Sequence, residues 1–252
     1  MNKIVLTGGP CGGKSSIVDF VVNDYDKKGY DFHFVDETAT NLFSNKFNTI
    51  KVGDEEISKF DFQTVLFLMQ FIKEYNTETS IIEEDAGDKS IILCDRGLLD
   101  GKAYMEDIDY EKILKKFGIV EDKLVKTYSA VLHLVSMYLK DKEFFASERP
   151  FAVNYAADID YYLKEAWSKC QNNFIIPTTD SIEEKRDMVY KYIDSSTDYR
   201  TPMLHDFYNE TYLLYMKEYL SAAFSYFEQN VCSDDKVKVL KMRSYAKEKN
   251  II

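Results

Sequence analysis

Short apolar runs alternate with longer amphipathic segments over the first 195 residues of the chain. Five runs have the length and composition of buried strands: 3–7, 32–35, 90–94, 131–135 and 174–176. Between them, apolar residues recur three or four positions apart, which predicts helices. These predicted helices cover residues 14–25, 58–84, 99–106, 110–116, 121–128, 153–169 and 181–193.

Strands that alternate with helices predict a parallel sheet with helices on both of its faces. We therefore expect an α/β fold, a three-layer sandwich around a five-stranded parallel sheet, in residues 1–197. The pattern then changes to one aromatic-rich helical stretch at 203–229. Residues 236–242 alternate apolar and basic side chains, as an edge strand would. We expect residues 198–252 to form a C-terminal helical extension that packs on the first domain.

A glycine-rich loop joins the first predicted strand to the first predicted helix. Residues 8–15 read GGPCGGKS and match G-x-x-x-x-G-K-[ST], the phosphate-binding loop (P-loop) of nucleotide-binding proteins. Its backbone N–H groups and the helix N-terminus surround a polyphosphate, Lys14 reaches the β- and γ-phosphates, and the Ser15 hydroxyl ligates Mg²⁺. The residues expected to contact the nucleotide are Gly8, Gly9, Pro10, Cys11, Gly12, Gly13, Lys14, Ser15 and Ser16.

Charged residues follow the second and third predicted strands, at the edge of the sheet where such folds bind their ligands. Asp95 follows four apolar residues, as a Walker-B aspartate does, and we expect it to hold Mg²⁺ directly or through water. ATPases of the AAA type usually carry a water-activating glutamate next, but here the residue is Arg96. A cation at this position favours phosphoryl transfer over hydrolysis. Glu37, or its neighbour Asp36, is then the candidate to orient or deprotonate an acceptor hydroxyl.

Simpler interpretations of these charged residues remain open at this point. Asp36 could cap a strand end, and Asp95 with Arg96 could form a surface ion pair.

These residues together resemble P-loop kinase-like NTPases. Residues 95–104, DRGLLDGKAY, are similar to a segment of thymidylate kinases. The TGGPCGGKS loop, the VDETA strand end at 35–39 and the DRG segment resemble more closely the AAA-domain family that includes the nicotinamide riboside kinase domain of bifunctional NAD-synthesis proteins. The resemblance spans roughly residues 1–195. It implies a P-loop NTPase fold that uses ATP and Mg²⁺.

A lid over the phosphates is expected at residues 138–156, after the fourth strand. Arg149 is its candidate arginine for the transferring phosphoryl group, supported by Lys140 and Lys142. Relatives often have a T-A-A-D-G-A type segment before the lid and an Asp-Asn pair after the last strand. This chain has SMYLKD at 136–141 and TTD at 178–180 instead.

Composition and charge narrow the range of partners. The chain has 32 Lys+Arg against 43 Asp+Glu, a net charge of −11, which argues against general binding of nucleic acid or anionic membranes. Its four cysteines are too scattered for a zinc motif, and the N-terminus lacks a signal-peptide pattern. The longest apolar stretch, 65–72, is too short to span a bilayer. We therefore expect a cytoplasmic protein with reduced thiols.

The function predicted from the sequence is Mg²⁺-dependent transfer of the ATP γ-phosphoryl group to a small nucleoside-like or nucleotide-like acceptor. The alternative is a nucleotide-binding regulatory switch with weak NTPase activity that acts on a protein partner. A ring-forming ATPase ranks last, because the chain lacks the Asp-Glu Walker B and the extra helical domain. The aromatic C-terminal helix is expected to pack on the core; a homodimer face or an acceptor-binding wall are the alternatives.

Overall fold

Five parallel strands form one sheet in the order β2-β5-β1-β6-β7. They are β1 (Asn2–Thr7), β2 (Asp31–Val35), β5 (Ser90–Asp95), β6 (Ala130–Leu134) and β7 (Asn173–Ile176). This computed structural model describes residues 1–27, 29–38, 51–52, 55–56, 59–84, 90–143, 155–196, 200–230 and 233–252. Each strand lies where an apolar run predicts it, so the predicted five-stranded α/β sandwich is confirmed.

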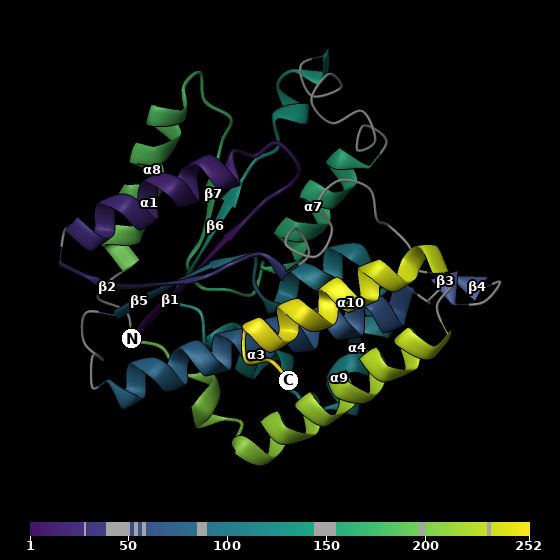
Figure 1. Ribbon diagram of the computed structural model, residues 1–252. Helices are drawn as coiled ribbons and strands as arrows, with labels where there is room; N and C mark the ends of the chain where they lie inside the picture. The colour runs from purple at the N-terminus through teal and green to yellow at the C-terminus, as the bar shows by residue number, and fades with distance from the viewer. Residues whose placement is uncertain are drawn as a thin grey trace.

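Helices cover both faces of the sheet (Figure 1). Helices α1 (Lys14–Lys27) and α8 (Ile182–Ser196) pack together on one face. Helix α3 (Lys59–Glu83) lies on the other face and carries α9 (Glu210–Asn230) on its outer side. The remaining helical elements are a 3₁₀ helix η1 (Leu98–Tyr104), α4 (Asp107–Lys116), α5 (Glu121–Lys126), η2 (Met137–Leu139), α7 (Ala156–Ala166), η4 (Leu204–Asp206) and α10 (Ser233–Glu248). A short hairpin of β3 (Lys51–Val52) and β4 (Glu55–Glu56) was not predicted.

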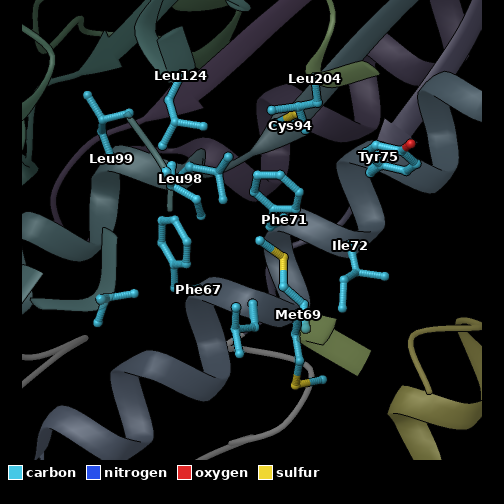
Figure 2. Packing of buried hydrophobic residues seen from close by; sticks show 14 of the residues in the cluster. Phe67, Met69, Phe71, Ile72, Tyr75, Cys94, Leu98, Leu99, Leu124 and Leu204 are labelled. Atoms are coloured by element: carbon cyan, nitrogen blue, oxygen red, sulfur yellow. The ribbon is translucent and has the colours of Figure 1, made fainter. Parts of the chain in front are cut away.

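The alternation of side chains along the strands divides the core into two clusters. Ile4 and Leu6 of β1 pack under α1 and α8, whereas Val5 between them packs on the α3 side. On that side Phe67 and Phe71 of α3 lie close to Leu98 (Figure 2). Because each fully buried side chain of this size contributes about 1.5–3 kcal/mol, the sheet is held firmly between its helical layers. Its carboxyl-terminal edge is therefore a rigid platform.

The C-terminal tail forms helix α10, so the predicted edge strand at 236–242 is wrong. Val239, Met242 and Ala246 are fully buried, and their spacing of three and four residues is helical. A strand would place Val237 on the same face as Val239, but Val237 is 58% exposed. Burial against neighbouring helices has therefore overridden the local alternation.

The aromatic stretch before it forms α9, whose inner face is buried. Met216, Leu220, Phe224 and Phe227 join the same cluster as the inner face of α3. Within the described ranges, no helix is both long and apolar enough to cross a bilayer.

Candidate active site

The loop between β1 and α1 has a backbone that requires glycine. Gly8 and Gly13 have φ angles of +139° and +87°, and Cys11 adopts a left-handed φ of 54°. A Cβ atom on Gly8 would lie 2.1 Å from the carbonyl oxygen of Leu134, at the end of β6. The glycine pattern of the motif thus follows from close packing of the loop against the sheet. Successive backbone N–H groups in such a conformation form an anion-binding nest.

The segment after β6 holds the loop from the other side. The Ser136 hydroxyl donates to the carbonyl oxygen of Pro10 at 2.6 Å, and the Met137 amide donates to that of Cys11 at 3.3 Å. Asp160 of α7 accepts a hydrogen bond from the Ser136 amide at 3.0 Å. These bonds fix the loop through elements that are far apart in the sequence.

Asp160 is itself buried and is held by a histidine and a lysine. His133 lies 3.1 Å from its Oδ1 atom, and Lys164 lies 2.8 Å from its Oδ2 atom. Burial raises the pKa of Asp160, but His133, Lys164 and the Ser136 amide outweigh this and lower it below its ordinary range. The carboxylate therefore stays ionised and keeps the Ser136 segment in place.

Lys14 stands at the first turn of α1, inside the loop. Its Nζ atom donates to the carbonyl oxygen of Gly8 at 3.1 Å. Burial and, after it, the Arg96 guanidinium lower the pKa of Lys14, Glu37 and Asp95 raise it, and the net result is a pKa of about 8. The amine therefore lies near Arg96, Glu37 and Asp95 and is partly buried, and a polyphosphate bound there would stabilise its charged form.

Arg96 extends from the end of β5 toward Glu37. Its backbone has a left-handed φ of 71°, and its amide donates to the carbonyl oxygen of Leu6 at 3.0 Å. The guanidinium Nε atom donates to Glu37, and the Tyr104 ring lies 5.6 Å from the guanidinium carbon. Nη1 is buried and has no hydrogen-bond partner among the residues that the structure describes. The two N–H groups of Nη1, on a fixed guanidinium, therefore remain for an anionic ligand.

Asp95 precedes it at the same edge of the sheet. Its Oδ1 atom is buried and, within the described part of the chain, accepts no hydrogen bond. Burial raises the pKa of Asp95 to about 6, with Glu37 contributing and Lys14 opposing, so the carboxylate is ionised at neutral pH. A buried carboxylate oxygen without a partner fits an Mg²⁺ ligand. Ser15 and Ser16 are exposed in the first turn of α1, where a bound phosphate chain would reach them.

Asp100 is a site residue that the sequence analysis missed. It is 3% exposed and accepts hydrogen bonds from the Thr7 hydroxyl, the Trp167 indole at 3.1 Å and the Gly97 amide at 2.7 Å. It thus ties the end of β1, just before the loop, to the residue that follows Arg96. A lone acid after two leucines is the feature that could have indicated its burial.

Lys185 of α8 is the second residue that was missed. It is 7% exposed, and its Nζ atom donates to the carbonyl oxygen of Gly12 at 2.9 Å. Burial lowers the pKa of Lys185, and Lys140 lowers it further. No carboxylate of the described residues forms an ion pair with it, unlike the buried Lys3 and Lys73. Its charge therefore adds to the positive field of the loop.

The structure brings four of the five predicted catalytic residues together: Lys14, Glu37, Asp95 and Arg96. The fifth, Arg149, lies outside the described residues, as do residues 144–154 of the predicted lid.

Two residues considered for the site, Asp36 and Lys140, form ion pairs elsewhere. Asp36 faces away from the loop and pairs with Lys73 at 2.9 Å. Lys140, at the start of the predicted lid, pairs with Asp180 at 2.5 Å. Of the two adjacent acids, Glu37 is therefore the one at the site.

Comparison with known families agrees with this geometry. The model of an AAA-domain family matches residues 3–185, which include the loop, all of the five-stranded sheet except Asn2, and the start of α8. No curated protein matches the chain.

Proposed function

The chain belongs to the AAA-domain family, with its nucleotide-binding P-loop, and we propose that it is an Mg²⁺-dependent phosphotransferase. In this proposal it moves the γ-phosphoryl group of ATP to a small acceptor, a nucleoside or a nucleotide. The observation that supports transfer most strongly is the position of Arg96. Its guanidinium is anchored by Glu37, and Nη1 is buried without a partner among the described residues.

A guanidinium in this position suits substrate oxygens better than a hydrolytic water. Arginine donates to phosphate oxygens but cannot take a proton from water, because it stays charged. Glu37 already accepts a hydrogen bond from Arg96, which fixes the orientation of the carboxylate. The pair can therefore hold an acceptor and its base in one geometry.

The transfer step follows from these roles. The acceptor oxygen attacks the γ-phosphorus, its proton passes to Glu37, and the bond to the ADP oxygen breaks. Lys14 and Arg96 stabilise the negative charge on the equatorial oxygens, and the loop amides hold the β-phosphate. Most of the rate gain would come from positioning and electrostatics.

Ser15 and Asp95 would hold Mg²⁺, which neutralises charge on the β- and γ-phosphate oxygens when bound. The described residues contain no group of three or more His, Cys, Asp or Glu that could cage a metal. This agrees with Mg²⁺, which binds through one or two carboxylates plus substrate phosphates and water.

A regulatory switch is the second candidate. The observation in its favour is the contact of Asp36, next to Glu37, with Tyr245 of α10 at 3.0 Å. Nucleotide binding near Glu37 could in this way change the C-terminal helices. A switch would bind nucleotide with negligible turnover and change its affinity for a protein partner.

ADP formation measured with and without acceptors tests the proposal. The panel contains nucleosides, nucleoside monophosphates and vitamin-like ribosides. At least one acceptor should raise the rate well above background, and Arg96→Met should remove this increase. Arg186→Met, on the surface of α8, is the matched control and should leave the rate unchanged. Slow hydrolysis that no acceptor accelerates would contradict the proposal.

A further inference from the structure

A cavity of about 500 Å³ lies away from the P-loop, between the exposed edge of the sheet and the C-terminal helices. Its walls come from β2, α3, α9 and the end of α10. Ligand pockets for small molecules span about 300–1,000 Å³, so a mononucleotide-sized compound fits this volume.

Three ammonium groups line the cavity: Lys73, Lys217 and Lys249. Lys73 and Lys249 share one carboxylate, Asp36, at 2.9 and 3.3 Å. Lys217 donates to the carbonyl oxygen of Asn250 at 2.9 Å and forms no ion pair within the described residues. With Glu248 as the second acid, the lining has an excess of one positive charge in a chain of net charge −11. An anion in the cavity would therefore meet Lys217 as an ammonium group that no carboxylate of the described residues pairs with.

The other walls suit a planar organic body. Phe34 of β2 lines the cavity and is 39% exposed, which is high for an aromatic residue in a strand. The polar residues Asn76, Thr77 and Ser80 line the α3 side, and their amide and hydroxyl groups donate to backbone carbonyl oxygens. A lining that combines an aromatic ring with polar residues suits a heterocycle, which can stack on the ring and form hydrogen bonds at its edge.

We propose that this cavity is a second ligand site, which binds a small phosphate monoester with a planar body, such as a nucleoside monophosphate. The phosphate would lie between Lys217 and Lys249, and the planar body would lie against Phe34. Burial lowers the pKa of Lys217 and of Lys73, and an anion next to these amines would offset that effect.

The site is placed to communicate with the active site. Lys249 and Tyr245 both contact Asp36, whose neighbour Glu37 pairs with Arg96. A phosphate that draws Lys249 away from Asp36 would break one of the contacts that hold the segment after β2, which includes Glu37. This regulatory part rests on the proposed function, whereas binding in the cavity does not.

Calorimetric titration with AMP tests binding, and adenosine tests the need for the phosphate. The titrations use Lys14→Ala protein, in which the P-loop lysine is absent. AMP should bind, adenosine should bind at least tenfold more weakly, and Lys217→Met should weaken AMP binding at least tenfold. Lys217→Arg should retain it, and Lys112→Met, an exposed lysine of α4, is the control. No AMP binding, or binding that Lys217→Met leaves unchanged, would overturn the proposal.

Regulation is tested separately with the wild-type chain. The affinity for ADP should change when AMP is present, because coupling between two sites is reciprocal. Lys217→Met should remove this change, because it weakens AMP binding. Equal ADP affinity with and without AMP would overturn the regulatory part. Phosphotransfer without AMP binding would contradict this inference alone, and AMP binding without phosphotransfer would contradict the proposed function alone.

Discussion

Replacing Asp100 by asparagine keeps the size of the side chain but turns one acceptor into a donor. The Oδ1 side can still accept from Thr7 and Trp167, since the asparagine carbonyl takes its place. The Oδ2 side now presents an NH₂ group to the Gly97 amide, which donates to it at 2.7 Å in the native chain. Asp100→Asn therefore loses one hydrogen bond to a charged acceptor and leaves a buried N–H group unsatisfied.

We expect this substitution to lower the free energy of unfolding by about 2–4 kcal/mol. For a chain of this size, that loss corresponds to a fall in Tm of about 4–16 °C. Denaturant unfolding and thermal melts measure both values. Asp19→Asn, an exposed carboxylate in the middle of α1, should change the unfolding free energy by no more than about 0.5 kcal/mol.

Activity provides a second measurement of the same change. Because Gly97 follows Arg96 directly, Asp100→Asn should lower the rate of phosphotransfer about tenfold or more. ADP affinity should change less, since the P-loop is held mainly from the Ser136 side. The reasoning fails if Asp100→Asn melts like the wild type, or if nucleotide affinity falls while the rate of transfer is unchanged.

Three further substitutions test other parts of the site. Lys185→Met should weaken ATP binding about tenfold in titrations, because it removes a charge worth roughly 1.4 kcal/mol. The control Lys191→Met, at an exposed position of the same helix, should leave ATP affinity unchanged. An equal loss of affinity in both variants would contradict the role of Lys185. Asp160→Asn should lower the unfolding free energy by about 2 kcal/mol at pH 7. The folded pKa of this aspartate is lowered, so its contribution is present above about pH 4 and is lost as the pH falls further. The difference from wild type should therefore shrink in unfolding measurements toward pH 3, while Asp19→Asn shows no such trend; a constant difference would count against the ionised form. Gly8→Ala places a Cβ atom 2.1 Å from the carbonyl oxygen of Leu134 and should lower the unfolding free energy by about 2 kcal/mol or more. A melting curve like that of the wild type would refute the packing argument.

The sequence was sufficient to predict the sheet and the loop because both depend on local patterns. A strand buried on both faces must be an uninterrupted apolar run, and all five runs became strands of the sheet. The P-loop is a contiguous motif whose glycines are required by its backbone. Asp95 and Arg96 could be placed because they directly follow one of these strands.

Residues that depend on long-range contacts could not be predicted in the same way. Asp100 acts through Thr7 and Trp167, which are far from it in the sequence, and nothing in the order of residues links the three. The choice between Asp36 and Glu37 depends on which side of the strand end each side chain occupies. Adjacent residues of an extended chain point in opposite directions, so only the register of β2 decides it.

The tail shows how local alternation can mislead. Its alternating lysines and valines fit a strand, but Val239 and Met242 are buried against other helices. Tertiary packing therefore decided between two patterns that the sequence supports about equally.

The fate of the γ-phosphate of ATP tests the central claim most directly. The chain would be incubated with γ-labelled ATP, Mg²⁺ and each acceptor of the panel, and the label would be followed into phosphorylated acceptor and inorganic phosphate. The account predicts that, with the right acceptor, most of the label appears on the acceptor, and that Arg96→Met abolishes this product. Label found only in inorganic phosphate, at a rate that is independent of every acceptor and of Arg96, would contradict it.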